Sequence, residues 1–204
     1  MTSERACALD EGWLLVVDYA SGKTRLLDPI AAKRWCQTSS TSPVPRVRWA
    51  PSWSTHEVPL AWEPPPRVSW RALATAGVGV LVTLTTAKAG TRGRKMHRLL
   101  RLVWWVSKLP RRATPATRAE EMVNAVRHFG FLPSRIACLE SSVATIVALA
   151  LQGRTATWHH GVRCDPIVLH AWISNNGVPV AEPPSTARCA KLLTITSETN
   201  KERA

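Results

Sequence analysis

Acidic residues are scarce in this chain. Its 204 residues hold 14 Asp and Glu against 27 Lys and Arg, which gives a formal net charge of +13 at pH 7. A surplus of this size favours an acidic partner, a nucleic acid or an anionic membrane surface. The basic residues are dispersed, however, apart from short clusters at 92–95 and 108–112. No basic stripe of the kind that follows a phosphate backbone is present, and an arginine-rich composition alone would give the same charge.

Metal-binding and secretion signals are also missing. The five cysteines are odd in number, and neither a CxxC pair nor a Cys/His pair shows zinc spacing. Residues 1–5 are not followed directly by an apolar segment, so the chain shows no secretory signal. These absences predict a cytoplasmic protein with free thiols, with no metal site and no cofactor.

Long apolar runs are absent too. One uncharged, mostly apolar run, 72–87, has 16 residues and includes two glycines and four threonines. A membrane-spanning helix needs about 20 apolar residues. The run therefore predicts a buried helix, and we expect no membrane span. The sequence shows no internal repeat.

The N-terminal part reads as a small strand–turn–strand–helix unit. Residues 13–18 and 24–27 predict two strands around a turn at Gly22. Asp28 and Pro29 then form a helix N-cap and first position. The next segment, 38–70, is rich in proline and carries four tryptophans, so we expect it to pack on a surface or on a partner.

Helices come first in the rest of the chain and strands follow. Helices are predicted over 96–108, 114–130 (with a capping box at Thr117 and Glu120) and 135–152. The period then changes to two, and strands are predicted over 155–163, 167–174, 178–180 and 191–196, with an Asn-Gly hairpin at 176–177. This order predicts an α+β domain.

Two single residues in this domain could carry chemistry. Cys138 begins an apolar helical run, where the helix N-terminus would favour a thiolate, and His170 lies on a later strand, where it could act as a base. A third group would orient the imidazole: Glu182 after the hairpin or Asp165 before the strand. A cysteine in such a helix is also a common core residue. His159 and His160 point to opposite faces of a strand and are poor co-ligands for a metal.

An ordered series of short motifs adds to this pair. The series comprises Cys138-Leu139, Gly161-Val162-Arg163 with Pro166, His170-Ala171-Trp172, the Asn-Gly turn and Lys191-Leu192-Leu193-Thr194-Ile195. Residues 93–196 thereby resemble the lasso-peptide maturation proteases, the "B protein" family with a transglutaminase-like, papain-related fold. The resemblance implies that Cys138 is the nucleophile and His170 the base. The aspartate of the family's triad is matched here by Glu182, in Ala181-Glu182-Pro183.

The N-terminal unit carries a second resemblance. Residues 13–36 resemble the first hairpin and helix of small winged-helix domains that recognise leader peptides, which bind the leader by strand addition. This implies leader-binding roles for residues of the two strands: Leu14, Val16, Leu26 and Leu27. We therefore predict a winged-helix-like leader-recognition domain at 1–70, a helical connector at 71–92 and a transglutaminase-like cysteine peptidase domain at 93–204.

Together the resemblances imply a leader peptidase. Its partners would be a precursor peptide and an asparagine-synthetase-like lasso cyclase, with no nucleic acid involved. The family typically cleaves the precursor just after a residue pair whose first member, second from the end of the leader, is threonine. The pocket for this threonine, S2, should therefore be small. Two alternatives stay open: a non-catalytic adaptor that binds leader and cyclase, and a basic nucleic-acid-binding protein, whose affinity would fall steeply with salt.

Overall fold

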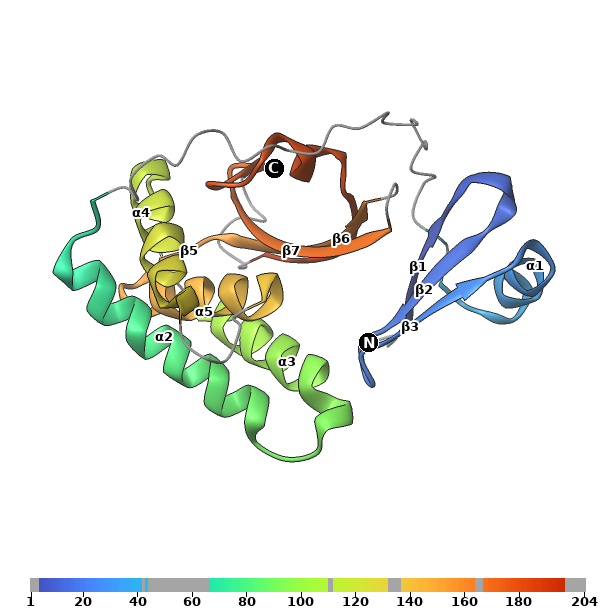
Figure 1. Cartoon of the computed structure of the whole chain (residues 1–204), viewed down its shortest axis with the longest axis horizontal. Helices are drawn as coiled ribbons and strands as arrows, with labels where there is room; N and C mark the ends of the chain where they lie inside the picture. Colours follow the sequence, from blue (N-terminus) through green and yellow to red (C-terminus); the bar gives the residue numbers. More distant parts are fainter. Residues whose placement is uncertain are drawn as a thin grey trace.

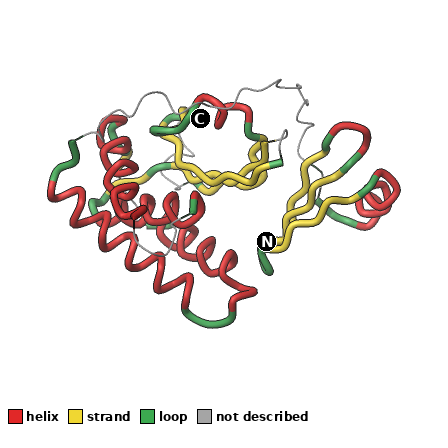
Figure 2. The backbone as a smooth tube through the Cα atoms, in the orientation of Figure 1, coloured by secondary structure: helices red, strands yellow, loops and turns green. Residues whose placement is uncertain are grey.

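The chain folds into two units that lie against each other. The computed structural model describes residues 4–41, 43, 67–109, 112–131, 137–163 and 167–196. Figure 1 shows a small N-terminal sheet with one helix beside a larger unit, in which helices cover one face of a second sheet. Figure 2 shows the same layering, with the helices of the larger unit on one side of its strands.

The N-terminal unit is a three-stranded antiparallel sheet in the order β1-β2-β3, followed by α1. Its elements are β1 (Glu4–Ala8), β2 (Leu14–Asp18), β3 (Lys23–Leu27) and α1 (Pro29–Thr38). The predicted hairpin and helix are present, and Asp28 caps the helix by accepting hydrogen bonds from the backbone N–H groups of Ile30 and Ala31 at 2.9 and 2.8 Å. The first strand was not predicted. The winged-helix assignment stays a prediction, since most of 42–66 lies outside the described residues.

Four helices form the layer of the larger unit: α2 (Trp70–Lys88), α3 (Lys95–Ser107), α4 (Ala116–Arg127) and α5 (Cys138–Leu151). The most apolar of these, α5, is buried along nearly its whole length, and α2 packs closely on it. A Cβ at Gly79 would lie 2.6 Å from the carbonyl oxygen of Ala144, so glycine is needed for this close approach. The predicted connector at 71–92 thus contributes a wall of the helical layer, while the domain boundaries themselves stay a prediction.

By length and composition alone, α2 could cross a membrane, with a mean hydropathy of 1.2 over its most apolar window. The same test is passed by core helices of soluble proteins, and α2 contributes Ala72, Ala76 and Val80 to the largest core cluster. The expectation of no membrane span stays a prediction.

The second sheet has the order β8-β7-β6-β9 and is antiparallel throughout. Its strands are β6 (Thr157–Arg163), β7 (Val168–Asn175), β8 (Val178–Pro179) and β9 (Ala190–Ile195). Asn176 and Gly177 have φ of 49° and 82°, the left-handed pair that a tight hairpin requires. A short parallel pair, β4 (Arg112–Ala113) with β5 (Arg154–Thr155), lies outside this sheet. The described residues also contain short 3₁₀-helices: η1 (Asp10–Gly12), η2 (Arg92–Arg94), η3 (His128–Phe131) and η4 (Pro184–Arg188).

The capping box predicted for α4 is wrong. The capping box at Thr117 and Glu120 is not formed, because α4 begins one residue earlier than Thr117 and its N-cap is Pro115, without a side-chain hydrogen bond. Thr114 instead donates to the carbonyl of Thr155 at 2.6 Å, which fixes the entry to α4 against β5.

The two units share a core. Side chains from the N-terminal sheet pack against the second sheet in one buried cluster, which includes Cys7, Leu9, Leu15, Val17, Tyr19, Val162 and Leu192. At its border the hydroxyl of Tyr19 lies 2.8 Å from Nδ1 of His160 on β6. The N-terminal sheet therefore has a fixed position on the larger unit.

Candidate active site

Cys138 is the first residue of α5. Ala137 precedes it in an extended conformation and supplies no side-chain cap, so the first-turn N–H groups are not bonded to a capping side chain. The thiol is exposed at the helix end. This is where the positive end of the helix dipole favours a thiolate.

The imidazole of His170 reaches this thiol from β7. Partial burial raises the pKa of Cys138, but the hydrogen bond and charge of His170 and the backbone N–H groups of Ala171 and Leu139 outweigh it, so the pKa lies below its ordinary 9.0. In turn, the hydrogen bonds to Cys138 and Glu182 raise the pKa of His170 to about 9. The two directions together describe a thiolate–imidazolium pair.

Glu182 orients the imidazole from the other side. Its Oε2 lies 2.7 Å from Nε2 of His170, and the carboxylate is 9% exposed. Because Nε2 is taken by Glu182, Nδ1 is the nitrogen left to face the thiol. Cys138, His170 and Glu182 therefore form a series in which each member contacts the next, the arrangement that a nucleophile, a base and an orienting acid require.

Arg127 on α4 holds the carboxylate in place. It donates from Nη2 to Oε1 of Glu182 at 3.0 Å and from Nη1 to the carbonyl of Ala181 at 2.6 Å. Thr186 adds a hydrogen bond to Oε2 at 3.3 Å. Ala181 has φ of 50°, an uncommon conformation for a residue with a side chain. The fork of Arg127 thus fixes both the backbone before Glu182 and the carboxylate itself.

A buried tryptophan supports the histidine. Trp172 lies two residues after His170 on the same face of β7, and their rings stack with centroids 5.7 Å apart and planes 10° apart. His159 stacks on the same tryptophan at 5.3 Å. The tryptophan is 2% exposed, so it covers the imidazole with an apolar surface that water does not reach.

A small cavity of about 230 Å³ opens beside the nucleophile. Its lining mixes hydroxyl groups of α5 with residues of β7, and comprises Val123, Arg127, Cys138, Ser141, Ser142, Thr145, His170, Ala171, Trp172, Ile173 and Glu182. The cavity therefore offers hydrogen-bond partners beside the sulfur of Cys138.

Three of the four residues predicted to bind a leader lie together. Leu14 and Val16 are buried between the N-terminal sheet and α1, and Leu27, which pairs with Leu14, packs against the same cluster. Leu26 is 49% exposed on the outer strand β3. The leader-binding role of all four residues stays a prediction.

Among the other sequence candidates, Asp165 lies outside the described residues. His159 accepts or donates to Thr194 and Ser174, whereas His160 contacts Tyr19 on the opposite face. Burial is the main cause that lowers the pKa of each histidine to about 4. Among the described residues no group of three or more His, Cys, Asp or Glu could hold a metal ion.

Sequence reasoning missed Arg127 and Trp172 as parts of the site. The position of Trp172 two residues after His170 on a strand was a usable signal, because such residues share a face. For Arg127 there was none, since nothing in the sequence distinguishes it from other helical arginines.

The comparisons agree with this architecture. Residues 80–194 match the family of transglutaminase-like superfamily domains. Because the match covers more than half of the 204 residues, the chain belongs to this superfamily. No curated protein and no solved structure matches the chain. The superfamily includes cysteine proteases and transferases, which is consistent with an enzyme.

Proposed function

We propose that this protein is a cysteine peptidase that removes the leader from a ribosomally made lasso-peptide precursor and delivers the core to a partner cyclase. The observation that carries the proposal is the contact series Cys138–His170–Glu182 on a transglutaminase-like domain. A shared core with the N-terminal sheet supports it, because that sheet would hold the leader while the peptidase domain cuts.

The chemistry follows from the pair. The Cys138 thiolate attacks the scissile carbonyl, and the protonated His170 gives its proton to the leaving amine of the core peptide. The leader remains as a thioester. His170 then takes a proton from water, which attacks the thioester and releases the leader as a free acid. First-turn N–H groups of α5 are available to the oxyanion.

The outer strand of the N-terminal sheet would hold the leader. In the sheet order β1-β2-β3, the described part of the chain places a strand on only one side of β3. Its free edge could pair with an extended leader, and Leu26 would contact the bound segment. The small hydroxyl-rich cavity beside Cys138 suits a threonine side chain at the cleavage site.

The test is cleavage of the precursor followed by mass spectrometry. The expected result is loss of the leader mass by the wild-type protein and none by Cys138→Ala. Glu182→Ala should slow cleavage strongly, since His170 would lose its orienting partner. Equal rates for Cys138→Ala and wild type would overturn the mechanism.

A thiol-labelling experiment distinguishes the peptidase from a non-catalytic adaptor. In a peptidase, Cys138 reacts with iodoacetamide near neutral pH faster than an ordinary thiol, and His170→Ala slows that reaction. Labelling of Cys138 that is slow and indifferent to His170→Ala would favour the adaptor. Labelled peptide mapping separates Cys138 from the exposed Cys36.

A further inference from the structure

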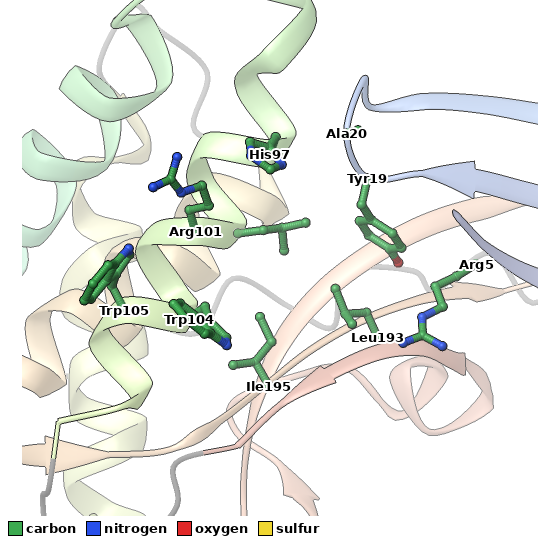
Figure 3. A pocket seen from close by; sticks show the side chains of 10 residues that line it. Arg5, Tyr19, Ala20, His97, Arg101, Trp104, Trp105, Leu193 and Ile195 are labelled. Atoms are coloured by element: carbon green, nitrogen blue, oxygen red, sulfur yellow. The ribbon is translucent and has the colours of Figure 1, made fainter. Parts of the chain in front are cut away.

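A second cavity lies where the two units meet, away from the catalytic series. It has a volume of about 280 Å³ and lies between the N-terminal sheet, α3 and β9. Figure 3 shows Tyr19 and Arg5 on one side, Trp104 and Arg101 on the other, and Leu193 between them. We call it the inter-unit groove. Small-molecule sites occupy about 300–1,000 Å³, so the groove suits one large side chain better than a whole ligand.

Its surface is apolar inside and basic at the rim. Leu100, Leu193 and Ile195 provide aliphatic surface, and Trp104 and Trp105 of α3 add indole rings, of which Trp105 is 58% exposed. None of the described residues that line the groove carries a carboxylate.

Two arginines, Arg5 and Arg101, supply the charge of this rim, and His97 adds a polar ring to it. Within the described part of the chain, neither Arg5 nor Arg101 forms a salt bridge. An occupant with a large apolar side chain and neighbouring carboxylates would therefore match both the interior and the rim.

The position of the groove favours a peptide as that occupant. It is walled by both the predicted leader-holding sheet and the peptidase domain, and it ends on β9, the outer strand of its sheet. Tyr19, one of its walls, contacts His160 of β6, the strand that pairs with β7.

We infer that the inter-unit groove binds an extended segment of the peptide substrate through one bulky apolar side chain flanked by acidic residues. The inference rests on the proposed function for its substrate class. It concerns a surface separate from the catalytic series and from the β3 edge, so it would add a second hold on the precursor.

Binding and cleavage are measured separately to test it. The probes are short Gly/Ser peptides with a central Glu-Phe-Glu, Lys-Phe-Lys or Glu-Ser-Glu sequence, titrated into the full-length protein while the tryptophan indole N–H signals are followed by NMR. Glu-Phe-Glu should shift the Trp104 and Trp105 signals and bind about tenfold more tightly than the other two peptides. Spectra of Trp104→Phe and Trp105→Ala assign the two signals.

Variants locate the effect. Arg101→Glu should weaken Glu-Phe-Glu binding by about tenfold and should raise KM for the precursor while kcat is kept. Arg112→Glu makes the same charge change at an exposed arginine of β4 outside the groove and should have no effect. Trp105→Ala is an exposed second variant that should abolish the preference for Phe over Ser without unfolding the protein.

Three outcomes would overturn the inference. They are equal effects of Arg101→Glu and Arg112→Glu, equal binding of Glu-Phe-Glu and Lys-Phe-Lys, and displacement of the peptide by a single-stranded oligonucleotide, which would make the rim a nucleic-acid surface. If the precursor is not cleaved at all, the proposed function fails, but the NMR titration still decides the groove.

Discussion

At the scale of single residues, the length of Glu182 gives the site its form. Its carboxylate contacts His170 with Oε2 and Arg127 with Oε1 at the same time. Arg127 also donates to the carbonyl of Ala181, the residue just before. The carboxylate of glutamate, one methylene longer than aspartate, is thus held at both of its oxygens.

Arg127 is therefore a positioning residue, and its removal should be felt in kcat. Arg127→Ala should lower kcat by about ten- to a hundredfold with little change in KM, because a misplacement of about 1 Å in a catalytic group carries that penalty. Arg127→Lys should recover only part, since lysine cannot make two fixed donor contacts. Steady-state cleavage of the precursor measures both constants.

The control is Arg118→Ala on the same helix, where the arginine pairs with Glu121 and Gln152 away from the site. It should keep kcat. Were Arg127→Ala to lower the melting temperature and leave kcat unchanged, the arginine would be structural only.

The ionisation of the pair fixes the pH dependence. The pKa of Cys138 lies below 9.0 and that of His170 is raised to about 9, so the thiolate–imidazolium form exists between the two values. Activity should rise as the thiol loses its proton. It should fall around pH 9, where the imidazolium loses the proton that the leaving amine needs. The measurement is kcat/KM between pH 5 and pH 10.

The raised pKa of His170 can also be tested directly in a variant that lacks the thiol. In Cys138→Ala, His170 loses the largest cause of its raised pKa and should titrate lower by NMR, with His170→Gln used to assign the signal. A basic limb of activity near the ordinary histidine value of 6.5 would contradict the ion pair.

Single residues also mark what the sequence could predict of the site. The order of helix start and strand drew attention to Cys138 and His170, but their roles were predicted from the resemblance of the surrounding motifs, because a cysteine in an apolar helix is also a common core residue. The choice between Glu182 and Asp165 could not be made from position in the sequence, because one follows the hairpin and the other precedes the strand of His170. Arg127 depends on how α4 packs beside the hairpin, which no local pattern encodes.

At the scale of elements, α5 is the central, buried helix of the larger unit. It carries the nucleophile at its first residue and is covered by α2, α3, α4 and β7. Any displacement of α2 is therefore transmitted to the helix that holds Cys138. The elements with clear periodicity were predictable: α3, β7 and the Asn-Gly hairpin lie where the sequence indicates. β1 was missed because Glu4–Ala8 lacks the β-branched and aromatic residues that mark strands, and it becomes a strand only by pairing with β2.

The contact between α2 and α5 yields the element-scale prediction. Gly79→Ala would place a Cβ 2.6 Å from the carbonyl of Ala144 and 3.1 Å from Cβ of Ala148, so the helices must separate. Overpacking of this kind costs about 1–3 kcal/mol in the free energy of unfolding. Urea denaturation measures it.

The matched control is Gly93→Ala, where no atom lies within 4 Å of the added Cβ. It should be neutral or stabilise by about 0.4–1 kcal/mol through the unfolded state. Equal stability of the two variants would show that α2 and α5 are not tightly packed at Gly79.

At the scale of the whole molecule, the N-terminal sheet and the second sheet share one buried cluster. Sequence reasoning treated the two parts as separate domains, because neither part alone shows which of its surfaces the other covers. Tyr19 directly follows the predicted first hairpin strand, and His160 lies in the middle of a distant predicted strand. Their contact, 141 positions apart in sequence, arises only from the docking of the two sheets.

This contact predicts that the two units unfold together. Tyr19→Phe keeps the ring but leaves Nδ1 of the buried His160 without its partner, which should cost about 1–3 kcal/mol. For a chain of this size each kcal/mol lowers the melting temperature by about 2–4 °C. Calorimetry should show one transition, displaced as a whole, since the cluster that includes Tyr19 and Val162 belongs to both units.

A double-mutant cycle separates the hydrogen bond from the packing. Replacing both partners by apolar rings removes the unpaired polar group, so Tyr19→Phe combined with His160→Phe should be less destabilising than the sum of the two single variants. A single transition together with this coupling would mean that the N-terminal sheet is a fixed part of the molecule. A leader bound to that sheet, as proposed above, would then stay at a constant distance from Cys138. Two transitions, with only the first displaced by Tyr19→Phe, would instead describe an independent module that docks without sharing stability.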